Sequence, residues 1–298
     1  MQDLRQPSAA FPNVSLRWLL SAIGVVLLGA IACALLALCL LYWQGSWQLL
    51  YHPAANITRT PASVNLPFDQ VHFASTETGT TQLTGWWIPN PNARFTVLYL
   101  HSADGNLSNT VDALAALHRN QLAIFAFDYR GYGQSRIEGA PMRPSEKQLR
   151  QDAEWALTWL TVTRSIPPKK IVIFGSGLGA NLAAEFAADH SEVAGAILDQ
   201  PLQDATAVIF NDPRSKLVPA HWMVKDRYDL DAASSSLRIP SLWLLAQSGD
   251  RAAALPDAYR TVQTQKTSTW LQLPITADPH FDETLKRWLD DLPSQTVH

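Results

Sequence analysis

The stretch Ile171-Val172-Ile173-Phe174-Gly175-Ser176-Gly177-Leu178-Gly179 decides how this sequence folds. Its first four residues are apolar and three are β-branched, which predicts a strand buried on both faces. Glycines follow at alternate positions, and residues 178–188 then have a helical pattern. This order predicts a sharp turn from strand to helix, in which the two backbones approach closely and the central residue has a positive φ.

Strand and helix patterns alternate on both sides of this turn. The predicted strands are 68–73, 82–88, 95–100, 122–127, 170–174, 193–198, 241–246 and 269–273, and the predicted helices are 107–118, 145–161, 178–188 and 281–292. Such alternation predicts an α/β fold with a mostly parallel sheet and helices on both faces. We expect one domain over residues 67–298, with a short apolar cap at about 201–240 between two strands.

The composition excludes several classes of protein. The chain has 298 residues, 47% of them hydrophobic and 16% charged, with a net charge of −3. A negative chain without a basic patch is not expected to bind nucleic acid. Two cysteines are too few for a disulfide scaffold, and no motif with metal-ligand spacing is present, so we expect neither a metal nor another cofactor.

Near the N-terminus, Leu19–Trp43 contains no Asp, Glu, Lys, Arg or His. At about 1.5 Å per residue, a helix of this length exceeds the roughly 30 Å hydrocarbon core of a bilayer. Trp18, Tyr42 and Trp43 lie at its two ends, where interfacial aromatic residues are common. The sequence therefore predicts a transmembrane helix at 18–43, followed by a linker at 44–66 punctuated by prolines.

Charges on either side of the predicted helix indicate its orientation. Arg5 and Arg17 precede it, and no Lys or Arg follows before Arg59. This bias predicts a short cytoplasmic N-terminus, residues 1–17, and a periplasmic body, with the bacterial inner membrane as the default location. The alternative is a cleaved lipoprotein signal ending at Ala30–Cys33, but ten further apolar residues follow, so we favour an uncleaved signal anchor.

The predicted strand-turn-helix has the context of a nucleophile elbow, whose pattern is G-x-S-x-G. In this turn the central serine points into an active site at the end of a sheet. Here Gly175 and Gly179 match the outer glycines, but the serine position is Gly177.

Other segments carry a family resemblance. They are H-S-A-D-G-N at 101–106, D-Y-R-G-Y-G-Q-S at 128–135, P-S-E at 144–146 and D-R-Y-D at 226–229. Together with the elbow, they resemble the Bem46/ABHD13-like α/β-hydrolase family, which is related to the serine-aminopeptidase-like hydrolases. The resemblance covers about residues 68–292, and the 128–135 string is its most specific part. It implies the α/β-hydrolase fold.

The resemblance also implies positions for a catalytic triad. Gly177 stands at the nucleophile position, Asp250 at the acid position after a strand, and His280 at the base position before the final helix. The backbone N–H groups of Leu178 and Ser102 would form the oxyanion hole.

Two functions follow from this pattern. We favour a pseudoenzyme that has lost its nucleophile and binds a small apolar or acyl ligand, or a protein partner. The alternative is an active hydrolase of esters, thioesters or amides that uses Ser176 with His280 and Asp250. Against it, a shift of one residue at a sharp turn redirects the side chain, and base catalysis needs the hydroxyl within about 3 Å of the imidazole. We expect His101, Asp128 and Arg130 to have structural roles.

Overall fold

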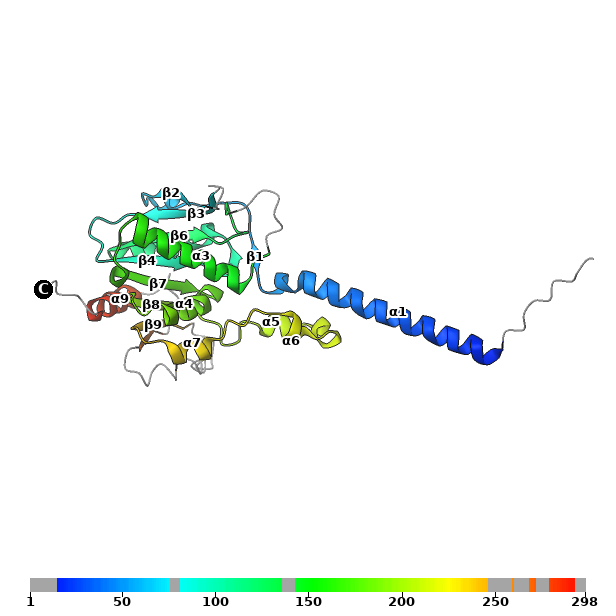
Figure 1. The fold of residues 1–298 in the computed structure, drawn as a ribbon. Helices are drawn as coiled ribbons and strands as arrows, with labels where there is room; N and C mark the ends of the chain where they lie inside the picture. Colours follow the sequence, from blue (N-terminus) through cyan, green and yellow to red (C-terminus); the bar gives the residue numbers. More distant parts are fainter. Residues whose placement is uncertain are drawn as a thin grey trace, which may run out of the picture.

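The first described element is α1 (Leu16–Gly45), a long helix that projects from the rest of the molecule (Figure 1). The structure is a computed structural model that describes residues 15–75, 81–135, 143–245, 259, 268–271 and 279–292. The side chain of Ser15 accepts a hydrogen bond from the N–H of Trp18 and caps the helix. Tyr42 is its one buried residue. In the described part of the chain, this is the single helix long and apolar enough to cross a membrane.

An eight-stranded sheet forms the centre of the domain, in the order β10-β9-β8-β7-β4-β6-β3-β2. Its strands are β2 (Asp69–Ser75), β3 (Thr81–Ile88), β4 (Phe95–Leu100), β6 (Leu122–Asp128), β7 (Ile171–Ser176), β8 (Gly195–Asp199), β9 (Ser241–Leu244) and β10 (Ser268–Leu271). Among the described strands, the β2–β3 and β3–β6 pairs are antiparallel and the other pairs are parallel. The mostly parallel sheet predicted from the apolar runs is therefore confirmed.

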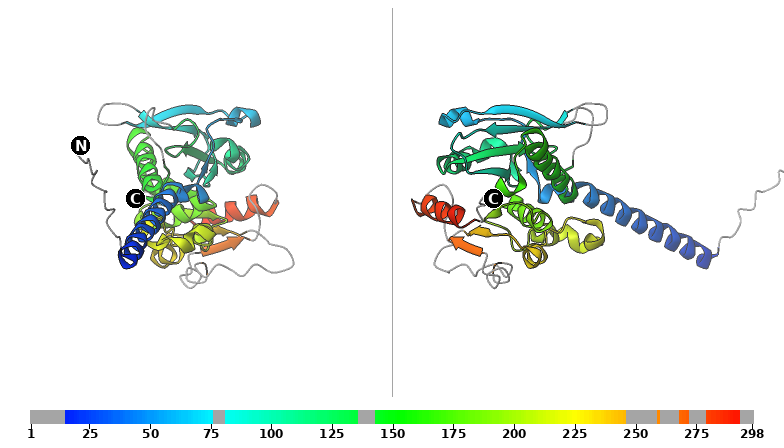
Figure 2. Two further views of the ribbon diagram at one scale, coloured as in Figure 1. Left: turned by 90° about the vertical axis from the view of Figure 1, so that its right-hand side faces the viewer. Right: turned by 60° about the vertical axis from the view of Figure 1, so that its left-hand side comes forward.

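Helices cover both faces of the sheet (Figures 1 and 2). They are α2 (Val111–Arg119), α3 (Glu146–Thr158), α4 (Leu178–Asp189), α7 (Leu230–Ser236) and α9 (Pro279–Asp291). Apolar side chains of α3, α4 and α7 join one buried cluster, and those of α2 and α9 join another. Between these two clusters the central strands are buried on both sides, which explains why their sequences are continuous apolar runs.

Helix α3 begins and ends for local reasons. Ser145 caps it by accepting a hydrogen bond from the N–H of Gln148. The regular α-helix ends at Thr158, and one π-helical turn, η4 (Trp159–Thr163), completes the predicted length. The 3-10 turns η2 (Pro61–Val64), η3 (Leu107–Thr110) and η5 (Pro168–Lys170) lie between other elements.

Residues 44–66, expected to form a linker, pack against the domain. After α1 the chain forms the 3-10 turn η1 (Ser46–Leu49) and then buries Leu50 and Tyr51. Strand β1 (His52–Pro53) next pairs with β5 (Asp104–Gly105), just beyond the carboxyl end of β4. This pairing ties the base of α1 to the carboxyl-terminal edge of the sheet.

The cap region contains three short turns of helix before α7. These are α5 (Ala207–Phe210), η6 (Pro213–Leu217) and α6 (Ala220–Met223). They extend from the same edge of the sheet as α1, and Figures 1 and 2 show α5 and α6 beside the base of that helix.

Candidate functional site

The turn between β7 and α4 has the backbone of an elbow. Gly177 lies between the two elements with φ 56° and ψ −124°, a conformation that L-residues rarely adopt. A Cβ on Gly175 would overlap the backbone of Gly179, and a Cβ on Gly179 would overlap the carbonyl oxygens of Leu100 and His101. The outer glycines therefore permit close backbone approach, and Gly177 permits the sharp bend.

Ser102 occupies the space next to Gly177. Its hydroxyl oxygen lies 2.9 Å, and its Cβ 3.4 Å, from the position that a Cβ on residue 177 would take. A serine at 177 would fit only if the Ser102 hydroxyl rotated away. The loop that the family resemblance assigns to the oxyanion hole thus places the Ser102 side chain next to the position where a nucleophile side chain would begin.

Backbone donors remain on both sides of this position. In the described part of the chain, neither the N–H of Ser102 nor that of Leu178 donates to a backbone carbonyl. The first N–H groups of a helix have no intrahelical acceptor, which explains the free donor of Leu178. These two groups could bind an oxygen atom of a ligand.

Ser176 belongs to a different cluster, at the ends of β7 and β8. Its hydroxyl donates to Oδ2 of Asp199 at 2.9 Å. Asp199 is only 6% exposed, and its other carboxylate oxygen, Oδ1, has no partner among the described residues. Burial raises the pKa of Asp199 to about 6, and hydrogen bonds from Ser176 and Gln200 oppose that rise. Burial also raises the pKa of the nearby Tyr99, while Ser176 acts in the opposite direction.

His280 lies on the opposite edge of the sheet from Gly177. It is exposed in the first turn of α9, two residues before Asp282, which accepts a hydrogen bond from the side chain of Asn120 at 2.7 Å. Asn120 precedes β6 and so marks the amino-terminal edge, whereas Gly177 marks the carboxyl edge. Strands of this length span about 20 Å. The structure does not bring His280 and Gly177 together, and Asp250 lies outside the described residues.

Comparison with known proteins agrees with this architecture. The family model for the alpha/beta hydrolase fold matches residues 96–271, which run from β4 to β10. The chain belongs to the α/β-hydrolase family.

Relatives of this α/β-hydrolase occur in bacteria and in yeast. Uncharacterized protein Rv2307c of Mycobacterium tuberculosis is 30% identical over 210 residues, which cover 70% of this chain and 71% of that protein. Uncharacterized membrane protein YNL320W of Saccharomyces cerevisiae is 30% identical over 158 residues, which cover 52% of this chain and 53% of the yeast protein.

Among solved structures, the Pf2001 esterase of Pyrococcus furiosus superposes with a TM-score of 0.60. The match covers 81% of this chain and 99% of the esterase, at 18% sequence identity. At this identity the likeness concerns the fold.

The D-Y-R-G-Y-G-Q-S loop of this α/β-hydrolase has a structural role. Oδ1 of Asp128 accepts a hydrogen bond from the N–H of Leu107 at 2.9 Å, and burial raises the pKa of Asp128 to about 7. Arg130 donates to Asp152 through both its backbone N–H and its Nε, at 2.8 and 2.7 Å. These bonds hold the loop against η3 and α3, as the sequence predicts.

His101 is also part of this framework. It is buried, and its Nδ1 lies 2.7 Å from the carbonyl oxygen of Ser102, so Nδ1 carries the proton. Burial lowers the pKa of His101 to about 4, which keeps the ring neutral. Its Nε2 lies 3.9 Å from Oδ1 of Asp128 and has no hydrogen bond among the described residues. A buried, neutral ring of this kind positions the loop that carries Ser102.

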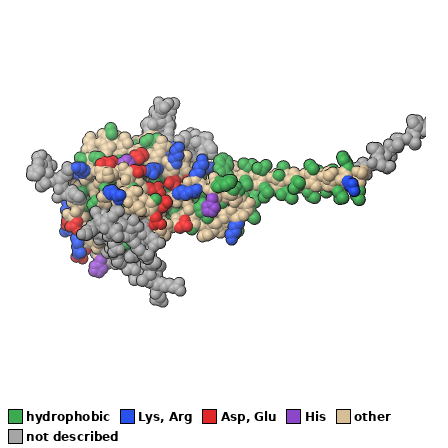
Figure 3. Space-filling model, turned by 60° about the horizontal axis from the view of Figure 1, so that its bottom comes forward, with side chains coloured by type: hydrophobic (Ala, Val, Ile, Leu, Met, Phe, Trp, Pro, Cys, Tyr) green, Lys and Arg blue, Asp and Glu red, His purple; other side chains and the backbone are tan. Residues whose placement is uncertain are grey.

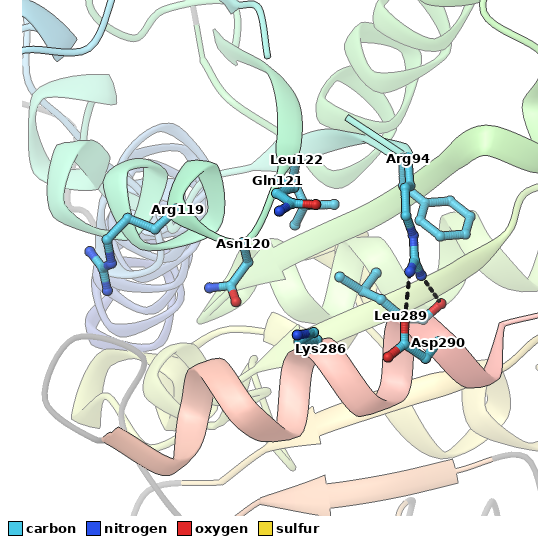
Figure 4. A pocket seen from close by; sticks show the side chains of 9 residues that line it. Arg94, Arg119, Asn120, Gln121, Leu122, Lys286, Leu289 and Asp290 are labelled. Atoms are coloured by element: carbon cyan, nitrogen blue, oxygen red, sulfur yellow. Dashed lines mark hydrogen bonds and ion pairs between the residues drawn. The ribbon is translucent and has the colours of Figure 1, made fainter. Parts of the chain in front are cut away.

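A cavity of about 200 Å³ lies at the amino-terminal edge, far from the elbow (Figure 4). It is lined by the ends of α2 and α9 and the starts of β4 and β6, including Arg94, Arg119 and Lys286. Arg94 points to Asp290 and to the carbonyl oxygen of Leu289, and Arg119 lies 3.6 Å from Asp282. This cavity lies at the edge of the sheet opposite to Gly177, and its arginines already have partners within the protein. We therefore do not assign it to the candidate site at Gly177.

Asp199 and Tyr99 are the site residues that reasoning from the sequence missed. Asp199 ends an apolar strand, Ala194-Gly195-Ala196-Ile197-Leu198-Asp199, at the edge where ligands of parallel sheets bind. The position of Asp199 at the end of an apolar strand is the feature of the sequence that could have identified it as a site residue. In the described part of the chain, no group of three or more His, Cys, Asp or Glu residues could hold a metal ion.

Proposed function

We propose that this α/β-hydrolase is a membrane-anchored pseudoenzyme that binds a small apolar or acyl ligand at the carboxyl-terminal edge of its sheet without cleaving it. The observation that carries the proposal is the pair Gly177 and Ser102. The turn has a positive φ at Gly177, residue 177 has no side chain, and the Ser102 hydroxyl lies 2.9 Å from the place that a Cβ on this residue would take.

The placement of His280 supports the same proposal. Acyl transfer by a serine needs a base that accepts the hydroxyl proton. His280 is in the first turn of α9, in which Asp282 accepts a hydrogen bond from Asn120 just before β6, whereas Gly177 follows the carboxyl end of β7. The position of the imidazole therefore argues against proton transfer at the elbow.

The competing function is hydrolysis through Ser176 with His280 and Asp250. The hydroxyl of Ser176 donates to Asp199 rather than to an imidazole. Ser176 is also the last residue of β7 and not the residue at the bend. These contacts favour the pseudoenzyme.

The location proposed with this function is a membrane spanned once by α1. The apolar length of α1 and the cations Arg5 and Arg17 before it support a cytoplasmic N-terminus and a periplasmic domain in a bacterial inner membrane.

The test uses the full chain in detergent micelles with a fluorophosphonate probe and a fluorescent dodecanoyl ester. We expect no covalent labelling, saturable binding of the ester, and recovery of the ester intact. Ser102→Ala and Ser176→Ala are expected to behave like the wild type in the labelling experiment.

A phosphonyl adduct mapped to Ser102 or Ser176, or release of free dodecanoate that one of these variants abolishes, would overturn the pseudoenzyme. Absence of saturable ester binding would overturn the proposed ligand class.

A further inference from the structure

The cap exposes large apolar side chains although its inner side is already packed. Trp222 of α6 is 87% exposed and Leu217 of η6 is 63% exposed, and Val208 of α5 is also exposed. The same segment buries Ile209, Val218, Ala220 and Val224 against the domain. Contact with the domain therefore does not require the exposed side chains, and exposed apolar groups of this size indicate an interaction surface.

This surface lies directly beside α1. The hydroxyl of Tyr42 donates to the carbonyl oxygen of Ile209 at 3.2 Å. One turn earlier in α1, Leu38 and Cys39 are partly buried against the same apolar cluster that contains Ile209. Figures 1 and 2 show α5 and α6 alongside the end of α1 from different directions.

The contact with Tyr42 gives the depth of the cap in a bilayer. The uncharged stretch Leu19–Trp43 is somewhat longer than the roughly 30 Å hydrocarbon core, so Tyr42 lies at its edge when α1 spans the membrane. Leu38 is about 6 Å deeper along the helix, at about 1.5 Å per residue. Interfacial segments are buried about 5–10 Å into the boundary between headgroups and acyl chains. The contacts between α1 and the cap fall within that zone.

Charge on the cap suits lipid headgroups. Residues 207–225 contain Arg214, Lys216 and Lys225 but only one acidic residue, Asp212, in a chain whose net charge is −3. Arg214 pairs with Asp212 at 2.8 Å, and the ion pairs found among the described residues do not involve Lys216 or Lys225. Figure 3 shows Lys and Arg side chains where α1 meets the domain.

A further cation lies at the same level. The guanidinium of Arg143, which precedes α3, stacks over the ring of Trp43 at 5.4 Å from its centroid. Cations around a patch of exposed aromatic and aliphatic side chains are typical of a surface that binds anionic lipid.

We propose that residues 207–225 form a membrane-docking surface, with Leu217 and Trp222 inserted in the interface of the bilayer that α1 spans and the cations facing anionic headgroups. This inference rests on the proposed membrane anchor but not on the loss of catalysis. Two attachments, α1 and the docking surface, would hold the carboxyl-terminal edge of the sheet against the bilayer.

The test measures the depth of single labels in the full chain. Cys33 and Cys39 are replaced by alanine, and an environment-sensitive fluorophore is attached at Trp222→Cys or Leu217→Cys. Val162→Cys is the matched control, because Val162 is also apolar and 71% exposed. It lies in η4, after the carboxyl end of α3, whereas the amino end of α3 is the end near α1. Each protein is reconstituted at low density in phosphatidylcholine vesicles, with and without phosphatidylglycerol and a nitroxide-labelled lipid.

We expect the nitroxide lipid to quench the labels at 217 and 222 at least twofold more than the label at 162, and phosphatidylglycerol to increase the difference. Equal quenching at all three sites, in protein that floats with the vesicles, overturns the docking surface alone. Protein that does not float overturns the anchor as well. A third outcome is that the fluorescence of the labels at 217 and 222 changes with the protein density in the vesicles but is not quenched by the nitroxide lipid. This outcome would overturn docking to lipid and assign the surface to contact with a second copy of the chain.

Discussion

A side chain at position 177 would compete for space with the Ser102 side chain. The effects of substitutions at these two positions on the free energy of unfolding should therefore be coupled. We expect Gly177→Ser to lower the free energy of unfolding by about 1–3 kcal/mol, because a side chain at φ 56° is strained and its Cβ lies 2.9 Å from the Ser102 hydroxyl. Adding Ser102→Ala should recover part of this loss, since it removes the closer atom. Thermal unfolding of the full chain in detergent measures both effects, with Ser102→Ala alone as the reference. An identical loss with and without the Ser102 hydroxyl would contradict the coupling.

Restoring the hydroxyl is not expected to restore reactivity. In Gly177→Ser combined with Ser102→Ala, the new hydroxyl would lie beside the backbone donors but without an imidazole, because His280 is on the opposite edge. We expect no fluorophosphonate labelling above that of the wild type. Strong labelling that disappears on His280→Ala would instead place His280 at the elbow.

Asp199 should make stability depend on pH in a defined direction. Its pKa is raised from 3.8 to about 6 in the folded protein, so the folded state holds the proton more tightly than the unfolded chain. The carboxyl therefore favours folding below about pH 4, and this contribution is lost as pH rises through 6. Asp199→Asn should be more stable than the wild type at pH 7–8, by up to about 3 kcal/mol, and similar to it at pH 4.

Thermal unfolding across this pH range checks the prediction. Asp212→Asn is the control, because Arg214 lowers the pKa of Asp212 to about 2 and its removal should give no gain at neutral pH. An Asp199→Asn variant that is less stable than the wild type at pH 7–8 would mean that the ionised carboxylate stabilises the fold through its bond with Ser176.

At the scale of elements, the apolar runs of the sequence were sufficient to predict the sheet. Strands such as β4 and β7 are buried on both faces, so their composition follows directly from their position. The sharp turn from β7 to α4 was predictable as well, because close backbone approach requires Gly175 and Gly179. Local pattern and local geometry agree in these elements, which is why a single sequence was informative.

Contacts between distant elements were not predictable in the same way. Tyr51, in the segment expected to be a linker, is buried and donates to Asp226 at 2.7 Å, across most of the chain. The bond between Ser176 and Asp199 depends on the register of β7 with β8, which hydrophobic pattern alone does not specify. The position of His280 depends on where α9 packs against the sheet. The order of residues along the chain does not specify this packing site, so the position of His280 could not be predicted from it.

The attachment of the 128–135 loop to α3 gives an element-scale prediction. Asp152 is fully buried and its main partner is Arg130, whose guanidinium also stacks over Trp155 at 4.9 Å. Arg130→Ala would leave this carboxylate buried without its cation, and we expect a loss of about 3–5 kcal/mol in unfolding free energy. Arg164→Ala is the matched control: Arg164 stacks over Trp87 at 4.5 Å but is exposed, so we expect a loss below about 1 kcal/mol. Thermal unfolding of both variants makes the comparison, and equal losses would contradict it.

At the scale of the whole molecule, α1, β1 and the cap all meet the domain at one edge of the sheet. Strand β1 joins the base of α1 to β5, and α5 contacts the turn η1 that follows α1. The elbow opens at this same edge, whereas α9 and the cavity near Arg94 lie at the other. If α1 spans a membrane as proposed, the elbow edge would face the bilayer and the α9 edge would face the aqueous phase.

We expect the charges that flank α1 to determine the side of the membrane on which the domain lies. Arg143 stacks over Trp43 near the end of α1, and Lys216 and Lys225 belong to the cap, but all three are distant in sequence from the end of the span. Orientation is set by cations in short flanking segments, so Arg5 and Arg17 count and these three do not. We therefore expect alkaline phosphatase fused after His298 to be active and green fluorescent protein at the same site to be dark in a bacterial host. The charge bias can be reversed with Arg5→Gln, Arg17→Gln, Gln44→Lys and Gln48→Lys. In this variant we expect the phosphatase fusion to lose activity and the green fluorescent protein fusion to become fluorescent. Cytoplasmic fluorescence from the unaltered chain would reverse the orientation and place the docking surface on the inner leaflet, where anionic lipid is more abundant.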